Sequence, residues 1–308
     1  MNWLAFVAIA VTFDSLRIFI DNYTSDVYFK GREAASQKLF YGFANVIGGI
    51  MALVILGFSI SSENWHLAAF ILLSGIISGI AGIPYYMALE IDDSTNLGIF
   101  TQLSPVLYLI LGWFFLGEQF SILQLVAFAV IIAAPILIIG TTRKRSRKVK
   151  LRAVFYAFLY VLIAVIGNLI FVQADEVAPW TLYQELGLLI LGRGIANLGA
   201  VSVVPKWRRR FSTVAKASRG KVYRPLLINF FVGFIKDIGY RGALITAPAV
   251  AMASAASDSI EPIVIFFMGL ILTLIWPKFG REKLNRKSVM VHLAATIMVV
   301  IGISILQM

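Results

Sequence analysis

Long apolar stretches separated by short polar connections run along the whole chain of 308 residues. A helix that crosses the hydrocarbon core of a bilayer needs about 20 mostly apolar residues. The stretches that meet this length lie at roughly 2–21, 39–59, 67–89, 95–116, 120–140, 153–173, 180–204, 225–246, 248–276 and 288–307. Because the connections leave no room for a folded soluble unit, the pattern predicts an all-α integral membrane protein with ten transmembrane helices.

The composition supports lipid as the solvent of this chain. Hydrophobic residues make up 59% and charged residues 14%, whereas a soluble domain has roughly 25% charged residues. The absence of cysteine excludes disulfides, thiol nucleophiles and cysteine-ligated metals. The first stretch, "MNWLAFVAIAVTFDSLRIFI", lacks the basic start and the cleavage site of a signal peptide. We therefore expect it to be the first span.

The charges are distributed unevenly between the two sides of this ten-span arrangement. Most of the 27 Lys and Arg residues fall in connections on one side, at 30–38, 143–152, 206–224 and 278–287. The opposite connections carry only acidic charges, at Glu63, Glu118, Asp175 and Glu176. Since Lys and Arg mark cytoplasmic loops, we expect a multi-pass protein of the cytoplasmic membrane with both termini outside.

The net charge of +11 also bears on partners. Basic connections attract anionic lipid headgroups, which we expect at 143–152 and 206–224. A nucleic-acid partner is not expected, because the chain lacks a recognition motif and a basic face interleaved with aromatic residues.

A motif recurs in the two halves of the chain. In the first, "IPYYMAL" at 83–89 is followed by Pro105, and in the second "IGYRGAL" at 238–244 is followed by Pro262. Each proline lies within a predicted span, and each span is followed by an acidic turn, "GEQFS" or "REKLN". Internal repeats of this kind are common in transporters.

The recurrence predicts two five-helix repeats, 1–140 and 153–308, joined by a basic cytoplasmic linker at 141–152. Because five is odd, the two repeats enter the membrane in opposite orientations. Inverted repeats are the basis of alternating access, with the substrate site near the midplane between them.

These motifs resemble the EamA branch of the drug/metabolite transporter superfamily. The similarity rests on the Ala-Leu that ends one span, on "LSP" in the next, on "GWFFLGEQFS", and on "IEP" in the second repeat. The second repeat departs from the family pattern, because "GLILTLIWPKFGREKLN" replaces the compact glycine-glutamate turn. The resemblance implies ten helices around a central cavity and transport of small polar metabolites. It leaves the substrate open, since members carry amino acids, drugs, sugar phosphates or nucleotide-sugars.

The eighth predicted span carries charges where a membrane helix is usually apolar. At 100° per residue, its polar side chains fall within an arc of roughly 140°. They are Asn229, Lys236, Asp237, Tyr240 and Arg241. The matching positions of the first repeat, Ala81, Gly82 and Tyr86, are uncharged. Since charges at membrane depth usually face the bundle interior, we interpret this arc as a specialisation of one half of the protein.

Ion pairing is the structural alternative to a role in binding. Asp237 and Arg241 are spaced i, i+4, and Asp14 and Arg17 are spaced i, i+3, so each pair could neutralise itself on one helix. We expect Tyr240 beside Lys236. If Asp237 pairs with Arg241, Lys236 remains the better candidate to bind a substrate carboxylate or phosphate, or a carboxylate on the first or ninth span. The substrate-binding candidates are Lys236, Asp237, Tyr240, Arg241, Asp14, Gln102 and Arg193.

The ninth predicted span has a second polar stripe. Ser254, Asp258 and Glu261 lie at i, i+4 and i+7, just before Pro262. Pro262 and its counterpart Pro105 should kink their helices and free backbone carbonyls. Burial favours the proton-bearing form of a carboxyl group, so Asp258, Glu261 and Asp14 are candidates for proton coupling. A proline-kinked packing helix is the alternative.

Other function classes fit less well. An intramembrane hydrolase needs a catalytic pair, but His66 and His292 are poorly placed and no Gly-x-Gly-Asp motif is present. The chain is therefore not expected to be an enzyme or to hold a cofactor or metal. We expect a secondary transporter of a small polar or zwitterionic metabolite, acting as a monomer or homodimer. The alternatives are a lipid flippase on the same fold and a carrier of an anionic sugar phosphate or nucleotide-sugar.

Overall fold

The computed structural model describes residues 2–30, 33–59, 61, 63–91, 103–142, 151–275 and 286–306. These parts are helical, and no strand occurs among them. The helices are α1 (Trp3–Thr24), α2 (Lys38–Ile55), α3 (Trp65–Ile91), α5 (Ser104–Leu116), α6 (Ile122–Thr142), α7 (Leu151–Asp175), α8 (Leu182–Val203), α9 (Pro205–Ala217), α10 (Tyr223–Thr246), α11 (Val250–Ile275) and α12 (Arg286–Leu306). Two short helical turns lie between α1 and α2, a π-helix at Ser25–Phe29 and a 3₁₀-helix at Ala34–Gln37.

Six helical segments of the described parts are long and apolar enough to cross a membrane. Three shorter apolar helices accompany them, at Ser104–Leu116, Ile122–Ala134 and Leu293–Leu306. Helix α10 has 24 residues and is also of membrane length, but its charges distinguish it from these apolar helices. A short non-helical segment at 247–249 separates α10 from α11, as the sequence predicted. The protein is an all-helical, multi-pass membrane protein.

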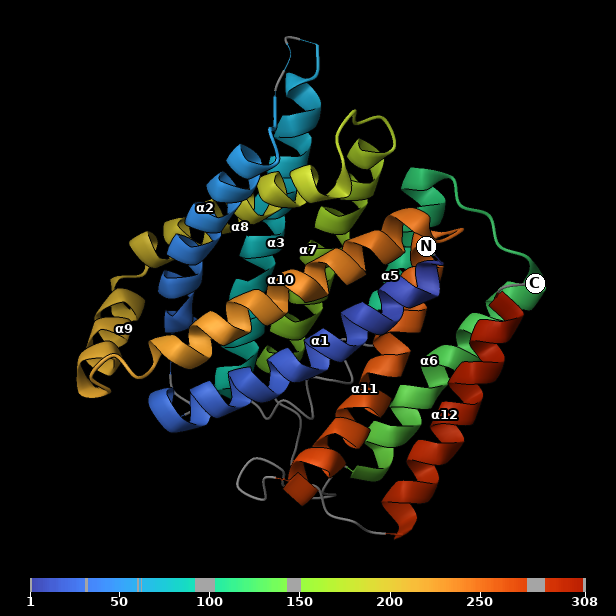
Figure 1. Ribbon diagram of the computed structural model, residues 1–308. Helices are drawn as coiled ribbons and strands as arrows, with labels where there is room; N and C mark the ends of the chain where they lie inside the picture. Colours follow the sequence, from blue (N-terminus) through green and yellow to red (C-terminus); the bar gives the residue numbers. More distant parts are fainter. Residues whose placement is uncertain are drawn as a thin grey trace.

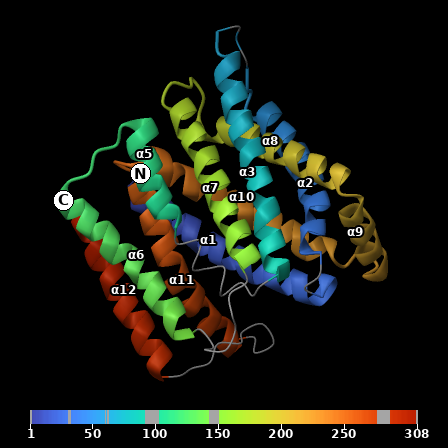
Figure 2. The same cartoon turned by 180° about the vertical axis from the view of Figure 1, so that it is seen from behind.

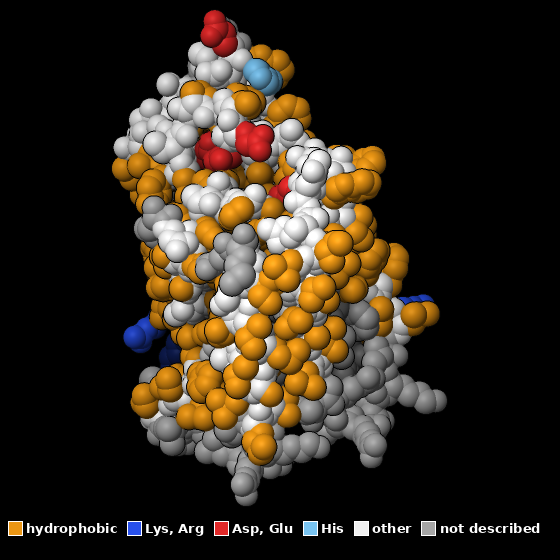
Figure 3. Space-filling view, turned by 90° about the vertical axis from the view of Figure 1, so that its right-hand side faces the viewer, with side chains coloured by type: hydrophobic (Ala, Val, Ile, Leu, Met, Phe, Trp, Pro, Cys, Tyr) orange, Lys and Arg blue, Asp and Glu red, His pale blue; other side chains and the backbone are white. Residues whose placement is uncertain are grey.

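The outer surface of the bundle is apolar. Figure 3 shows a face covered mainly by hydrophobic side chains, with acidic side chains gathered toward one end. Large exposed apolar side chains occur on α6 and on α12, among them Ile122, Val126, Leu293 and Ile297. Such a surface is unfavourable in water and suits contact with lipid.

The helices pack in pairs drawn from the two halves of the chain. Helix α2 packs on α8, α6 on α12, α1 along α10, and α3 along α7 (Figures 1 and 2). Helix α11 lies against α1, α5 and α6. The first helix begins and the last helix ends near the same end of the bundle, and α9 lies at the opposite end (Figure 1).

Helix α9 was not predicted, because its many basic residues gave that segment the composition of a loop. Its apolar side chains Trp207, Phe211 and Val214 are spaced i, i+4, i+7 and are buried. On its polar side, Lys206 Nζ lies 2.9 Å from a carboxylate oxygen of Glu33, and Arg210 donates to the Phe29 carbonyl at 3.1 Å. The segment is therefore an amphipathic helix fixed to the turn after α1.

The glycine-glutamate turn joins the two halves of the protein. Gly117 has φ +67°, a conformation that glycine adopts without strain. The Glu118 carboxylate accepts a hydrogen bond from the Val250 backbone N–H at 2.5 Å, so it binds the start of α11, where a negative charge is stabilised. Burial raises the pKa of Glu118, and the bond from Val250 opposes this shift. A Cβ on Gly112 would collide with the same carboxylate.

Candidate functional site

Charged side chains of three helices meet in the middle of the bundle. We call this group the charged cluster. It consists of Asp14, Arg17 and Asp21 of α1, Arg193 of α8, and Lys236 and Asp237 of α10. It joins residues of both halves of the chain, as expected for a site between two repeats.

Helix α1 presents its three charges on one face, since they are spaced i, i+3 and i+7. Arg17 lies between the two carboxylates, with Nη1 3.4 Å from Asp14 Oδ1 and Nε 3.6 Å from Asp21 Oδ2. The pairing of Asp14 with Arg17 is the structural alternative that their helical spacing offered. The side chain of Arg17 is 35% exposed, so this part of the cluster remains accessible within the bundle.

Lys236 connects α1 to α10. Its ammonium nitrogen lies 3.6 Å from Asp14 Oδ2 and 3.8 Å from Asp237 Oδ1. It also lies 5.1 Å from the ring centre of Tyr240, a distance at which a cation is attracted to an aromatic face. The sequence predicted Tyr240 beside Lys236, and a carboxylate on the first span was one of the partners left open for Lys236; both contacts are present.

Close helix packing positions Arg193 toward Asp237. Gly192 faces α3, where an added Cβ would collide with the Leu72 carbonyl, and Gly194 faces α2, where it would lie 2.7 Å from the Val46 nitrogen. Small residues let membrane helices approach this closely. Helix α8 is thereby held between α2 and α3, and Arg193 Nη1 donates to Asp237 Oδ2 at 2.5 Å.

The expected pairing of Asp237 with Arg241 is not present. Asp237 instead bonds to Arg193 and Lys236. Residues four apart on a helix can pair, but here the Asp237 carboxylate binds the guanidinium of Arg193 on a second helix. Arg241 lies one turn further along α10, stacked 4.6 Å over the Phe171 ring, with Nη2 3.4 Å from Ser78 Oγ.

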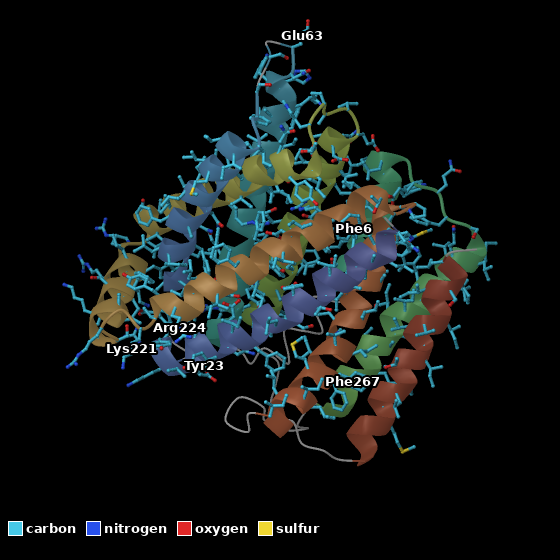
Figure 4. The ribbon with its side chains drawn as sticks, in the orientation of Figure 1. Phe6, Tyr23, Glu63, Lys221, Arg224 and Phe267 are labelled. Carbon is cyan, nitrogen blue, oxygen red and sulfur yellow. The ribbon has the colours of Figure 1, made fainter. Side chains whose placement is uncertain are left out.

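The wall beside Arg241 is lined by hydroxyl groups. The hydroxyls of Tyr108 and Tyr240 lie 3.2 Å apart, and the Asn168 amide donates to Tyr108. Figure 4 labels Phe6 of α1 beside this half of α10, and a Cβ on Gly242 would lie 2.5 Å from the Phe6 ring. This half of the site is closely packed, and Arg241 is 2% exposed.

The polar stripe of α11 forms as predicted. Ser254 donates to Asp258 Oδ2 at 3.1 Å, and its hydroxyl lies 3.4 Å from that of Ser104 on α5. Glu261 lies within electrostatic reach of Asp14 and Lys236. The stripe therefore borders the charged cluster.

The two prolines occupy different positions in their helices. Pro262 lies inside α11, as expected for a kink site, whereas Pro105 stands in the first turn of α5. Gln102, a predicted substrate ligand, lies outside the described residues.

Sequence reasoning missed Asp21 of the charged cluster and Lys38, which lies within electrostatic reach of Arg17 and Arg193. Asp21 was placed at the end of a span, although its spacing from Asp14 and Arg17 would have revealed the shared face. Lys38 was counted with the cytoplasmic cations, but it starts α2, is 4% exposed and donates to Asn197 Oδ1 at 2.8 Å. No local signal marks Lys38, because its partners are distant in sequence.

The charged cluster offers cations and carboxylates that can bind charged groups of a solute. Over the described residues, no group of three or more His, Cys, Asp or Glu side chains is arranged to hold a metal ion. Alternating cations and carboxylates at membrane depth are typical of substrate and ion pathways.

Comparison with known proteins supports this interpretation. Residues 27–140 match the model of the EamA-like transporter family. The resemblance is thereby confirmed over residues 27–140, and it indicates a membrane transporter of the drug/metabolite type. A crystal structure matches with a TM-score of 0.63 at 15% identity, covering 98% of this chain and 94% of that one. This likeness concerns the fold alone. No curated protein matches the sequence.

Proposed function

We propose that the protein is a secondary transporter that moves a small polar or zwitterionic metabolite by alternating access between two inverted five-helix repeats. The observation that carries this proposal is the charged cluster, in which α1 of the first half meets α8 and α10 of the second. Charges are costly at membrane depth, so a group that gathers cations and carboxylates from both halves favours a solute path over a packing role.

The pattern of helix packing supports inverted repeats. In chain order, the helices of the first half, α1, α2, α3, α5 and α6, correspond to α7, α8, α10, α11 and α12 of the second. When each helix is replaced by its counterpart, the pair α1–α10 becomes the pair α7–α3. Both pairs pack extensively, and α2–α8 and α6–α12 each convert into themselves. This is the relation that a two-fold axis in the membrane plane would produce.

One pair departs from this symmetry in a way that fits alternating access. Helix α3 packs extensively on α8, whereas the corresponding pair, α10 and α2, makes few contacts. In an inverted-repeat carrier, the two halves exchange such arrangements as the site changes sides. We infer that the structure represents one of the two states.

Exchange of solutes across liposomes tests the proposed function. Purified protein is reconstituted with an internal mixture of unlabelled zwitterionic and anionic metabolites, and uptake of each labelled compound is measured with and without a proton gradient. We expect at least one compound to exchange, and Lys236→Met to lower that exchange by about tenfold or more, because Asp14 and Asp237 lose the cation that they share. If no soluble compound exchanges while a headgroup-labelled lipid crosses the bilayer, the protein is a flippase and the proposal is wrong.

We further propose that the α9 end of the bundle faces the cytoplasm and that both termini lie outside. Glu63 and Lys221 lie at opposite ends of the bundle (Figure 4), and basic residues mark the cytoplasmic side, where they also meet anionic lipid headgroups. Because the chain has no cysteine, single cysteines report accessibility directly. An impermeant thiol reagent should label Ser61→Cys in intact cells, and Ser212→Cys only after permeabilisation. The reverse pattern would invert the topology.

A further inference from the structure

Arg241 is a buried cation that the ion pairs of the charged cluster leave out. It is 2% exposed, and its nitrogens Nε and Nη1 have no hydrogen-bond partner among the described residues. Among the same residues, the remaining nitrogen, Nη2, has one hydrogen-bond partner, the Ser78 hydroxyl, at the long distance of 3.4 Å. The carboxylate one turn earlier, Asp237, is held by Arg193 and Lys236.

A cation in this position requires a counter-charge. The guanidinium of arginine stays protonated in proteins, so burial cannot neutralise it as it can a lysine. The ring of Phe171 attracts the guanidinium, but such a contact replaces only part of the solvation that burial removes. Buried charges without partners are rare. Among the described neighbours, the Asp237 carboxylate attracts Arg241 electrostatically but forms no direct ion pair with it, so the positive charge of Arg241 is compensated only in part.

The groups around Arg241 are suited to an oxyanion. The hydroxyls of Tyr108 and Tyr240 lie within its electrostatic reach, and Ser78 provides a further hydroxyl. Each hydroxyl can donate a hydrogen bond. The planar guanidinium matches the two oxygens of a carboxylate or phosphate in a bidentate arrangement. The corresponding residue of the first half, Tyr86, is uncharged, so this feature occurs once and would orient an asymmetric solute.

We propose that Arg241 binds the carboxylate or phosphate group of the transported solute, in a state in which α3 and α7 move away from α10. The proposal rests on the proposed transport function and narrows its substrate class to solutes that carry an oxyanion. It also transfers the anion-binding role from Lys236, which is neutralised by Asp14 and Asp237, to Arg241.

Binding to purified protein tests the assignment without a transport assay. The probes are inorganic phosphate, malonate and glycine, with ethanolamine and glycerol as compounds that lack an oxyanion. Dihexanoyl phosphatidylglycerol tests a lipid headgroup as the source of the phosphate. We expect at least one soluble oxyanion probe to raise Tm in a saturable manner. Arg241→Gln should weaken this binding by about tenfold or more, whereas Arg219→Gln, which removes the same charge from an exposed position, should leave it unchanged.

The proposal is wrong if no soluble oxyanion probe binds, if only the lipid probe binds, or if Arg241→Gln binds as tightly as the unmodified protein. If Arg241→Gln does not fold, the binding of the same probes is measured with Arg241→Lys, which keeps the charge and loses the bidentate geometry. An affinity equal to that of the unmodified protein would contradict the proposal. Oxyanion binding without solute exchange would contradict the carrier function alone. Exchange with an unchanged half-saturation concentration in Arg241→Gln would contradict the role of Arg241 alone.

Discussion

Asp237→Ala is expected to lower the free energy of unfolding by about 3–5 kcal/mol, the range measured when one partner of a buried ion pair is removed. The Asp237 side chain is 6% exposed and pairs with both Arg193 and Lys236. Its loss leaves Arg193 without a carboxylate among the described residues and leaves Lys236 with Asp14 only. Thermal unfolding in detergent should show a fall in Tm of roughly 10 °C.

Two further variants show whether the effect arises from unpaired charge. Glu176→Ala removes a carboxylate from an exposed connection and should leave Tm nearly unchanged. The double variant with Arg193→Met and Asp237→Leu removes both charges, and replacing a whole buried pair by apolar groups is often tolerated. We expect it to recover most of the stability while transport stays absent. A double variant as unstable as Asp237→Ala would show that the cavity left by Asp237, and not charge, causes the loss.

Much of the fold could be predicted from the sequence because the hydrophobic effect acts locally along a membrane helix. The apolar stretches located the long helices of the described residues and the break between α10 and α11, whereas α5 covers only the end of the stretch at 95–116, whose beginning lies outside the described residues. Helix α9 was missed because it is not an apolar stretch. It is an amphipathic helix with a strongly basic polar side, so its average composition is that of a loop.

The candidate site was predicted in part, and the limit was helix-to-helix geometry. Pairs within α1 follow from helical spacing, so the pairing of Asp14 with Arg17 was available from the sequence as the structural alternative. The partner of Asp237 depends on how deeply α8 packs, and the two glycines that permit its approach are separated in sequence from every residue they contact. Spacing alone favoured Arg241, and the structure replaces it with Arg193.

The contact between α3 and α8 gives the second large expected effect. Gly192→Val should destabilise the protein by more than about 3 kcal/mol, because overpacking of this size forces backbone shifts. An added Cβ would collide with the Leu72 carbonyl, and a backbone atom cannot move aside by changing rotamer. The matched control on the same helix is Gly199→Val. Among the described residues, no atom beyond its own stretch of helix lies within 4 Å of a Cβ at Gly199. The two substitutions change helix propensity equally, so their difference in Tm measures packing.

Gly192→Ala separates a static contact from one that breaks during transport. If α3 and α8 stay packed in every state, this variant should lower stability and leave the accessibility of introduced cysteines unchanged. If they separate when the site changes sides, as the unequal packing of α3–α8 and α10–α2 implies, the added methyl group disfavours only the state described here. The population should then shift toward the other state. With Ser78→Cys as the reporter on α3, we expect the labelling rate to change several-fold on introducing Gly192→Ala and to stay constant on introducing Gly199→Ala. Equal labelling rates in the two variants, together with a lower Tm for Gly192→Ala, would mean that α3 and α8 stay packed in every state. The change between states would then take place at other helix contacts.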